Sequence, residues 1–468
     1  MITIEELTKI KPETYPRNDI GSSNLFHTLY CDVLRYVPER KSFMMYDGKV
    51  WVKDMDDLQA HEYAKDFAVS MLNYANSLNN ENRDEIIKYY AKYLNRPNRK
   101  KLIDDVKGIY PLSVDVFDKK AYLFNCQNAT VNLITGMATP HDPEDYLSKI
   151  SNVRFDPDAK SEEWERFVQD IMLGDQELIQ YLQKCLGYSI SAATFQECFF
   201  TAYGKTTRNG KGTLDGTMQH MLGDYAKAAA PETFESKRYK SSSGSEDVAR
   251  LAGARYVSVY EPSEGMTLDS SLIKAMSGND KITARFLYEN SFEFVSSFKI
   301  WLFTNHLPNI TDDSVFRSNR VLMVPFNRHF SEEEQDRGLK SRLQKQENIS
   351  GIFNWCMEGF QKLGEEGKLT IPEKVKKDIE RYRQSNDRLG EFLNECYTNH
   401  IDGIKHREKL SVIYKAYCKW CIANNYKVLN KKNFKEKLGE KVQIERYIGQ
   451  DHALGIEPSE GMPSEWLI

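Results

Sequence analysis

Long apolar runs are absent from this chain of 468 residues. A membrane-spanning helix needs roughly 20 consecutive apolar residues, and no stretch approaches that length. The opening residues, "MITIEELTKIKPETYPRND", also have neither the basic start nor the apolar core of a secretion signal. We therefore expect a protein of the cytoplasm that has no membrane partner.

Clustered metal ligands are also scarce. The chain has eight cysteines and nine histidines, and only Cys418 and Cys421 form a C-x-x-C pair. A zinc site of this type needs a second such pair, which the sequence does not have. Apolar residues flank the two cysteines at helical spacing, so we expect both to pack on a helix as small apolar side chains.

Charge of one sign is not in excess over the whole chain. The net charge is −4, so any basic surface must be local. The segment 402–447 has such a bias, with twelve Lys or Arg against five Asp or Glu. This clustering favours a module that contacts DNA, because cations along one face release counterions from the phosphate backbone. The alternative is an ordinary solvated helical face.

The length exceeds the roughly 100–200 residues of one domain. A Ser-rich stretch over 235–247 predicts a mobile loop, and the Pro/Gly/Ser-rich residues 455–468 predict a loose tail. Changes in residue pattern then predict five regions. These are an α+β domain over 1–150, a helical segment over 151–195, an α/β core over 196–330, a helical extension over 331–388 and a small basic, helical domain over 389–468.

Short apolar runs predict strands in two of these regions. In the first region, "KAYLFNCQNATVNLITG" (120–136) predicts strand, turn and strand. In the α/β core, four runs separated in part by helical patterns predict a mostly parallel sheet. The four runs are "ECFFTAYG" (197–204), "RYVSVYE" (255–261), "FKIWLFTN" (298–305) and "RVLMVPF" (320–326).

The stretch "YGKTTRNGKGTL" (203–214) joins the first of these strands to a helix pattern. Strand, Gly-rich loop and helix is the context of a phosphate-binding loop, where backbone N–H groups and the helix N-terminus hold phosphate oxygens. The loop departs from the common pattern twice, because Gly212 replaces the usual Ser or Thr and the first glycine lies one residue further away. The candidate loop residues are Gly204, Asn209, Gly210, Lys211, Gly212 and Thr213, with Thr213 as the replacement magnesium ligand.

Polar residues follow or precede the later strands. Glu261 ends the second strand and Glu264 follows it, and carboxylates beside a phosphate loop hold Mg²⁺ and polarise the attacking water. Asn305 ends the third strand and could orient that water. Arg317 and Arg320 precede the fourth strand, where an arginine could enter a neighbouring subunit's site. Each feature has a plain alternative, namely solvated acids, a turn asparagine and a surface ion pair, but their order along the chain favours a nucleotide site.

Together these motifs resemble the helicase part of phage and plasmid primase-helicases and their poxvirus-type relatives. These proteins are superfamily 3 helicases, which are related to the AAA+ ATPases. The most specific run joins Lys274, Gly278, Asp280 and Arg285. The likeness covers nearly the whole chain, and it includes "NGKGT" (209–213), "LAGARYVSVYEPSEG" (251–265), "FKIWLFTNHLP" (298–308), "PHDPEDYLSKISNVRFDP" (140–157) and "GIFNWCMEGFQKL" (351–363).

The resemblance implies an AAA+-like P-loop core that assembles into a ring, usually a hexamer, and hydrolyses ATP with Mg²⁺ between subunits. It implies that Lys211 binds phosphate, that Glu261 and Glu264 serve magnesium and water, and that Asn305 is the sensor. Arg320 is the first choice for the arginine finger and Arg317 the second. It also implies a phage or mobile element as source, a bacterial host cytoplasm, and a separate primase or replication protein as partner.

No priming site is expected in the chain itself. The acidic "KDMDD" (53–57) precedes a helical pattern, and negative charge is favourable at a helix start without any catalytic role.

Two places are candidates for DNA binding. In the resembled helicases a hairpin before the sensor strand lines the pore, and the cations here would be Lys274, Lys281 and Arg285. Phe286 or Tyr288 could stack on bases there, although the alternative is that both aromatics belong to the strand core. In the basic segment, "VLNKKNFKEKLGE" (428–440) could be a recognition helix of a winged-helix-like fold. Its candidate residues are Lys431, Lys432 and Lys435.

The favoured function is therefore an ATP-dependent replicative DNA helicase that acts on single-stranded and forked DNA. One alternative is an origin-binding initiator whose ATPase drives assembly or melting of an origin duplex. Another is a non-catalytic DNA-binding scaffold with a degenerate loop.

Overall fold

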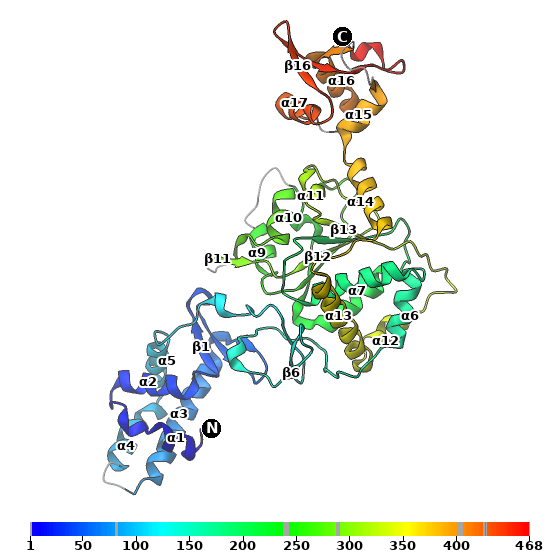
Figure 1. The fold of residues 1–468 in the computed structure, drawn as a ribbon. Coiled ribbons are helices and arrows are strands. Elements are labelled where there is room, and N and C mark those ends of the chain that lie inside the picture. The colour runs from blue at the N-terminus through cyan, green and yellow to red at the C-terminus, as the bar shows by residue number, and fades with distance from the viewer. Residues whose placement is uncertain are drawn as a thin grey trace. The chain divides into compact units, whose positions relative to one another are not determined.

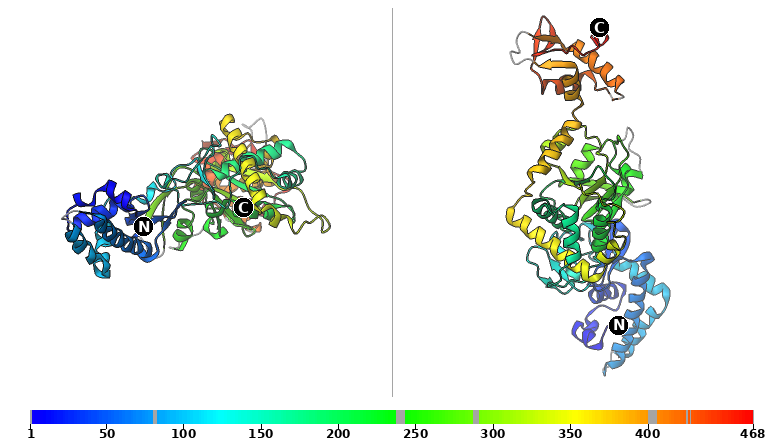
Figure 2. Two further views of the ribbon diagram at one scale, coloured as in Figure 1. Left: turned by 90° about the horizontal axis from the view of Figure 1, so that it is seen from below. Right: turned by 90° about the vertical axis from the view of Figure 1, so that its right-hand side faces the viewer.

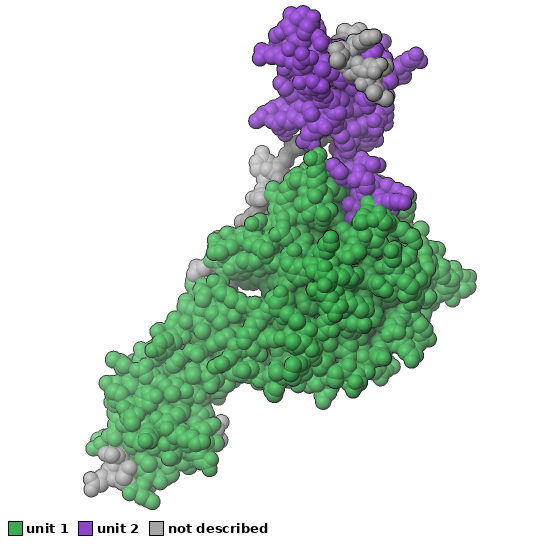
Figure 3. Space-filling model, in the orientation of Figure 1, with its two compact units in different colours: residues 1–376 green, residues 377–468 purple. Residues whose placement is uncertain are grey.

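A computed structural model of the chain describes residues 2–79, 83–236, 243–286, 291–399, 406–424, 426 and 428–467. It divides into two compact units, residues 1–376 and 377–468 (Figure 3). Residues 237–242 of the predicted loop over 235–247 lie outside the described residues, and the part from Ser243 on belongs to a helix instead.

Among the residues described up to Val106, five α-helices and a three-stranded sheet are present (Figure 1), and the helices pack around an apolar core that Leu34 and Phe43 of the sheet join. Phe26, Phe67 and Tyr90 are all at most 2% exposed in that core. The carboxylate of Asp54 accepts hydrogen bonds from the N–H groups of Gln59 and Ala60, so the acidic stretch starts a helix as expected. The elements are α1 (Ile4–Ile10), α2 (Asp19–Tyr30), β1 (Leu34–Val37), β2 (Ser42–Tyr46), β3 (Trp51–Lys53), α3 (Leu58–Ser77), α4 (Arg83–Tyr90) and α5 (Arg96–Val106).

The predicted strand, turn and strand over 120–136 are confirmed. They form the antiparallel pair β4 (Leu123–Asn125) and β5 (Thr130–Asn132), which β6 (Ala138–Thr139) extends. The buried Arg255 ties this small sheet to the α/β core, because its guanidinium donates to the carbonyl oxygens of Leu123 and Ile190.

Two helices, α6 (Glu162–Ile171) and α7 (Gln176–Ile190), occupy the helical segment before the core. Helix α7 lies against α13 (Gln346–Glu366) (Figure 2). The close approach depends on Gly187, where an added Cβ would lie 2.4 Å from the Cys356 carbonyl oxygen.

The α/β core contains the expected parallel sheet, with strand order β13-β7-β12-β9-β8. All four predicted strands are confirmed. The sequence analysis missed the edge strand β8, whose short "AKAA" run is neither β-branched nor strongly apolar. The strands are β7 (Phe199–Tyr203), β8 (Ala226–Ala229), β9 (Tyr256–Tyr260), β12 (Lys299–Thr304) and β13 (Val321–Pro325).

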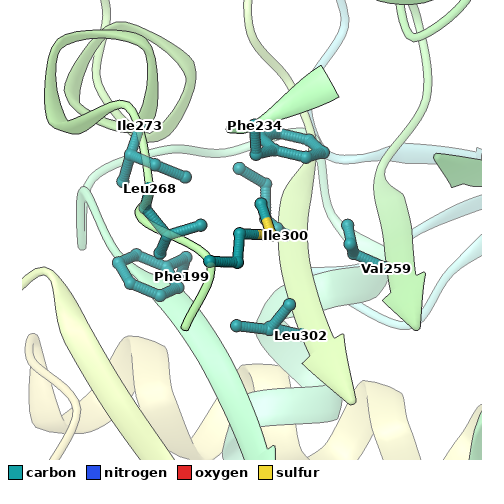
Figure 4. Close-up of a pocket in the computed structure, with 8 residues that line it drawn as sticks. Phe199, Phe234, Val259, Leu268, Ile273, Ile300 and Leu302 are labelled. Carbon is teal, nitrogen blue, oxygen red and sulfur yellow. The ribbon is translucent and has the colours of Figure 1, made fainter. Parts of the chain in front are cut away.

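Helices cover both faces of this sheet. On one face, Trp301 of β12 donates its indole N–H to Ser189 of α7 at 2.9 Å. On the other face, Ile300 and Leu302 meet Ile273 of α10 around a void of about 10 Å³ (Figure 4). All residues that line this void are apolar, so it is a packing defect of the core rather than a ligand site.

The remaining elements of this unit surround the sheet. An antiparallel hairpin precedes β12, and its strands pair Lys281 with Val295 and Arg285 with Ser291. The elements are α8 (Lys211–Leu222), α9 (Ser243–Ala249), α10 (Ser270–Ser277), β10 (Lys281–Arg285), β11 (Ser291–Val295), α11 (Ser314–Arg317) and α12 (Leu339–Leu343); α14 (Glu373–Ser385) follows α13.

The second unit contains more strand than the sequence analysis expected. Its tail is not loose, because β18 pairs with β14 and Met462 is only 8% exposed in the core. Cys418 and Cys421 both lie on α16, as expected. The elements are α15 (Arg388–Cys396), β14 (Tyr397–Asn399), β15 (Arg407–Lys409), α16 (Leu410–Ala423), α17 (Lys431–Gly439), β16 (Ile444–Tyr447), β17 (Gln450–Leu454) and β18 (Ile456–Pro458), and the antiparallel order β15-β17-β16 forms a small sheet.

Candidate functional site

The Gly-rich loop joins the end of β7 to the start of α8, and two of its glycines are sterically required. Gly210 has φ +89° and an added Cβ would lie 2.5 Å from the Ile171 side chain. At Gly204, an added Cβ would lie 2.3 Å from the Phe326 carbonyl oxygen. Side chains are therefore excluded from both ends of the turn, and the backbone is left to line it.

A segment after β13 braces the same loop, and the sequence analysis missed it. The N–H of Phe330 donates to the Arg208 carbonyl oxygen at 2.9 Å, and the His329 ring lies 2.9 Å from the Thr207 carbonyl oxygen. The buried Asn209 donates its amide N–H groups to the Thr206 and Phe326 carbonyl oxygens. No local pattern reveals this brace, because the two segments lie about 120 residues apart in the chain.

Lys211 lies at the carboxyl edge of the sheet. Its ammonium donates to the Thr304 carbonyl oxygen at 2.9 Å and to Asn305 Oδ1 at 2.5 Å. Burial lowers the pKa of Lys211 to about 8, and the nearby Glu261 carboxylate opposes that shift. The structure thus brings together three of the predicted residues, from the loop, the second strand and the third strand.

Glu261 stands directly after β9 in a left-handed backbone conformation, with φ +45°. Its N–H donates to the Phe303 carbonyl oxygen at 3.0 Å, which fixes the turn against β12. The segment that follows, which contains Glu264, is paired through Met266 and Leu268 with Asn309. The ends of β9 and β12 therefore continue side by side beyond the sheet, and a non-glycine residue at positive φ is a strained conformation typical of functional sites.

The residues around the loop fit a magnesium ion that is bound mainly through phosphates and water. Mg²⁺ usually takes only one or two carboxylates from a protein beside substrate phosphates. Glu261 supplies such a carboxylate, and the half-buried Thr213 hydroxyl lies in the first turn of α8. Over the described part of the chain, no group of three or more His, Cys, Asp or Glu side chains could hold a metal without such a substrate.

Arg317 and Arg320 lie at the opposite edge of the sheet. Val321, the first residue of β13, pairs with Phe199, the first residue of β7. The five residues of β7 span about 16 Å, so both arginines are far from the Lys211 of their own chain.

The two arginines differ in their surroundings. The Arg320 side chain is 15% exposed and donates to Glu197 Oε2 at 2.6 Å and to Ser277 Oγ at 2.9 Å. The Arg317 side chain is 58% exposed and donates to Asp313 at 2.5 Å. Arg320, the first choice from the sequence, is therefore engaged inside its own subunit, whereas Arg317 is the more accessible.

The structure places the predicted DNA-binding cations at separate sites. The Lys274 ammonium bonds to Asp312 at 2.6 Å and to Ser314 at 2.5 Å. Lys281 and Arg285 lie on the exposed face of the β10–β11 hairpin, and Lys281 pairs with Glu293 at 3.3 Å. Phe286 stacks on Phe292 with ring centroids 5.6 Å apart, while Tyr288 lies outside the described residues.

In the second unit, Lys431 and Lys432 form the exposed start of α17. Lys435, one turn later, bonds to Asp451 of β17 at 2.5 Å.

In the first unit, the cluster at the sheet edge is built from a lysine, an amide and a carboxylate on three neighbouring elements. The chain is thus a parallel α/β protein with a lysine-containing glycine loop at the carboxyl edge of its sheet, followed by a small α+β module.

Two family models match the chain. Residues 23–173 match the family described as "D5 N terminal like", and residues 384–467 match "Poxvirus D5 protein-like". Over these two segments the chain is similar to D5-type families, which confirms the resemblance to primase-helicases stated from its sequence motifs.

Several curated relatives carry the name "Putative helicase". One from Acanthamoeba polyphaga mimivirus is 25% identical over 66% of this chain and 34% of its own length. One from Frog virus 3 is 26% identical over 47% of this chain and 24% of its own length, and one from Sputnik virophage is 26% identical over 50% and 32%. The chain therefore spans about a third or less of these relatives.

Among solved structures, the apo NrS-1 C terminal region is similar over 92% of this chain and 97% of its own, with a TM-score of 0.48 and 9% identity. Within the described residues, no helix is both long and apolar enough to cross a membrane.

Proposed function

We propose that this chain is the motor part of a replicative DNA helicase from a virus or another mobile genetic element, and that it hydrolyses ATP between subunits of a ring. The observation that carries the proposal is the position of Lys211. Its ammonium is held by Thr304 and Asn305 at the carboxyl edge of the sheet, beside Glu261. Ligands of open parallel sheets bind at this edge, and the curated relatives are named as helicases.

The strand order supports an AAA+-like P-loop core. We number the strands β7, β8, β9, β12 and β13 from one to five by their order along the chain. In the sheet they lie side by side in the order five, one, four, three and two. The loop follows the first strand, the carboxylate the third and the asparagine the fourth. A triphosphate bound on the loop would therefore lie within reach of all three elements.

Each residue then has a role in phosphoryl transfer. Lys211 binds the β- and γ-phosphates, and Asn305 and Glu264 orient the attacking water. Glu261 and Thr213 hold Mg²⁺, which neutralises charge on the phosphate oxygens when bound. Because Arg317 lies at the opposite edge of the sheet, it completes the site of a neighbouring subunit and makes the ring necessary for hydrolysis.

Two regions would contact DNA. The exposed face of the β10–β11 hairpin carries Lys281 and Arg285 toward a single strand. In the second unit, α15, β15, α16, α17, β16 and β17 follow one another as helix, strand, helix, helix and two strands, apart from the separate pair β14 and β18. This order and the sheet β15-β17-β16 support a winged-helix-like module. Lys431 and Lys432 at the start of α17 would then contact duplex DNA, where the recognition helix of such modules docks.

The direct test uses the purified chain with Mg²⁺, ATP and DNA. We expect DNA-stimulated ATP hydrolysis, unwinding of a forked duplex and a larger assembly in the presence of a non-hydrolysable ATP analogue. A chain that stays monomeric and turns over no nucleotide under all of these conditions would contradict the proposal.

Nucleotide affinity should depend on pH through Lys211. Because its pKa is about 8, the Lys211 side chain of the nucleotide-free protein is mostly neutral at pH 9. Phosphate binding requires the protonated ammonium. Binding then takes up a proton, and the Kd for ATP should rise about tenfold for each pH unit above 8. Calorimetric titrations between pH 7.5 and 9.5 measure this slope.

The matched control is Lys211→Arg, because a guanidinium stays protonated throughout this range. Its residual affinity should be nearly independent of pH. An equal slope in both proteins would show that another group titrates.

Serine should be accepted at Gly212. An added Cβ there meets no atom within 4 Å, and serine is favoured over glycine in a helix by roughly 0.5 kcal/mol. We expect Gly212→Ser to keep the melting temperature and to reach half-maximal hydrolysis at a lower Mg²⁺ concentration, because its hydroxyl adds a metal ligand. The contrasting variant is Gly210→Ser, where positive φ and the contact with Ile171 should abolish activity. Loss of nucleotide binding in Gly212→Ser would contradict the assigned loop geometry.

An origin-binding initiator is the second candidate, since the basic segment 402–447 lies in a separate compact unit, residues 377–468. A chain ending at residue 376 distinguishes the two functions. If the module only recognises an origin, the shortened chain should still unwind a forked substrate and should lose binding to intact duplex.

A further inference from the structure

Helix α8 and strand β9 are joined by a row of polar contacts, which is buried at Tyr256 and half-buried at Tyr260, whose relative exposure is 38%. Alternate residues of β9, Tyr256, Ser258 and Tyr260, face α8, whereas Val259 faces the opposite side of the sheet. The partners on α8 are Asp215 and Gln219. An interface between a helix and a central strand is normally apolar, so this row calls for a physical explanation.

Asp215 is the centre of the row. It is 0% exposed and accepts hydrogen bonds from the Tyr256 hydroxyl at 2.7 Å, from the Tyr260 hydroxyl and from the Gln219 amide. Burial raises the pKa of its carboxyl, while the three donors oppose that change. A carboxylate buried this deeply is costly, and its three donors are what make it tolerable.

The row ends at the proposed site. Asp215 follows Lys211 by four residues and therefore lies on the same side of α8. Tyr260 directly precedes Glu261, and its ring stacks on Phe303 of β12 with centroids 5.2 Å apart. The hydrogen bond between Tyr260 and Asp215 is thus the last side-chain contact before the chain turns, at positive φ, into the Glu261 carboxylate.

We propose that Asp215 and Tyr260 are positioning residues that set the distance between the Lys211 ammonium and the Glu261 carboxylate. The inference rests on the proposed function, in which these two groups act on the same triphosphate. It assigns a role to a buried carboxylate and a tyrosine outside the expected set of site residues. Glu261 is the one carboxylate assigned to Mg²⁺, so its placement affects how the metal would be held.

The test compares two tyrosine variants that remove one hydroxyl each from the same carboxylate. Tyr260→Phe removes the contact next to Glu261 and keeps the ring on Phe303. Tyr256→Phe removes the other contact, at the buried start of β9. We expect Tyr256→Phe to lower the melting temperature at least as much as Tyr260→Phe, because its hydrogen bond is fully buried. Only Tyr260→Phe should lower kcat, by about tenfold or more, because small displacements of catalytic groups have large effects.

A second measurement does not depend on turnover. Tight binding of a non-hydrolysable ATP analogue should need a higher Mg²⁺ concentration in Tyr260→Phe than in Tyr256→Phe. The Kd measured without Mg²⁺ should be the same in both variants. Adding Tyr260→Phe to Glu261→Gln should not raise the Mg²⁺ concentration needed for analogue binding any further, because both changes act through one carboxylate.

The outcomes separate this inference from the proposed function. A wild-type protein without hydrolysis would overturn the proposed function itself. A wild-type protein that hydrolyses ATP, with equal kcat and equal Mg²⁺ dependence in the two tyrosine variants, would overturn the positioning role alone. A further rise in the Mg²⁺ concentration that the double variant needs for analogue binding would overturn it as well.

Discussion

Alanine at Lys211 should reduce ATP hydrolysis by at least about 100-fold, which is the usual effect of removing one donor that stabilises transition-state charge. In the structure the ammonium reaches Thr304 and Asn305, so it lies where the phosphates would be bound. Alanine provides neither the charge nor the length of lysine. ATP affinity should fall as well, because the ammonium contacts the phosphates before the reaction. Steady-state hydrolysis with single-stranded DNA measures the effect.

The control is Lys368→Ala, which removes one exposed lysine between α13 and α14, far along the chain from the loop. It should hydrolyse ATP at the wild-type rate. Both variants should bind duplex DNA normally, because residues 377–468 form a separate unit. Full hydrolysis by Lys211→Ala would favour the scaffold interpretation, in which the loop is degenerate.

Loss of Arg317 should have the largest effect. Alanine at this position should lower hydrolysis by about 10³-fold or more, the range found for arginine fingers, without preventing ATP binding. The reason is geometric, since Arg317 lies before β13 at the opposite edge of the sheet from Lys211 and can act only on a neighbour's nucleotide.

Mixing two inactive proteins tests this arrangement. Glu261→Gln lacks the carboxylate of its own site, and Arg317→Ala lacks the arginine for the next one. In a randomly mixed ring about a quarter of the interfaces regain both groups, so hydrolysis should partly recover. Absence of recovery, with both variants assembled, would contradict catalysis between subunits.

Arg320→Ala provides the comparison for Arg317. Its guanidinium is bound to Glu197 and Ser277, so alanine leaves these partners unsatisfied and should lower the melting temperature. Each arginine variant is mixed in turn with Glu261→Gln. If Arg320→Ala restores hydrolysis in this mixture and Arg317→Ala does not, Arg320 is the arginine finger and the assignment to Arg317 is wrong.

Much of the α/β core could be predicted from the sequence. The apolar runs ending at Gly204, Glu261, Asn305 and Phe326 each form a strand, because buried parallel strands are continuous apolar segments. The edge strand β8 escaped prediction because its alanines have little strand preference. The tail after Gly455 was predicted to be loose because Pro, Gly and Ser dominate it, yet Ile456 and Met462 are buried.

The candidate site could be predicted only in its local parts. Lys211 and its glycines form one continuous motif, so their types and spacing pointed to phosphate. The brace by His329 and Phe330 and the row around Asp215 join segments that are distant in the chain. For Arg320 the sequence suggested a partner in the next subunit, but it could not reveal the intramolecular pair with Glu197.

The sequence by itself determined which segments become strands and which chemical groups follow each one, because these properties depend on neighbouring residues and on side-chain period. Only the tertiary structure decided that β12 lies between β7 and β9, which brings Asn305 to Lys211. It likewise decided that β13 pairs with β7, which sets Arg317 at the edge of the sheet opposite Lys211. Strand order results from pairing between segments as distant in the chain as Phe199 and Val321, and such long-range contacts leave no local pattern in the chain.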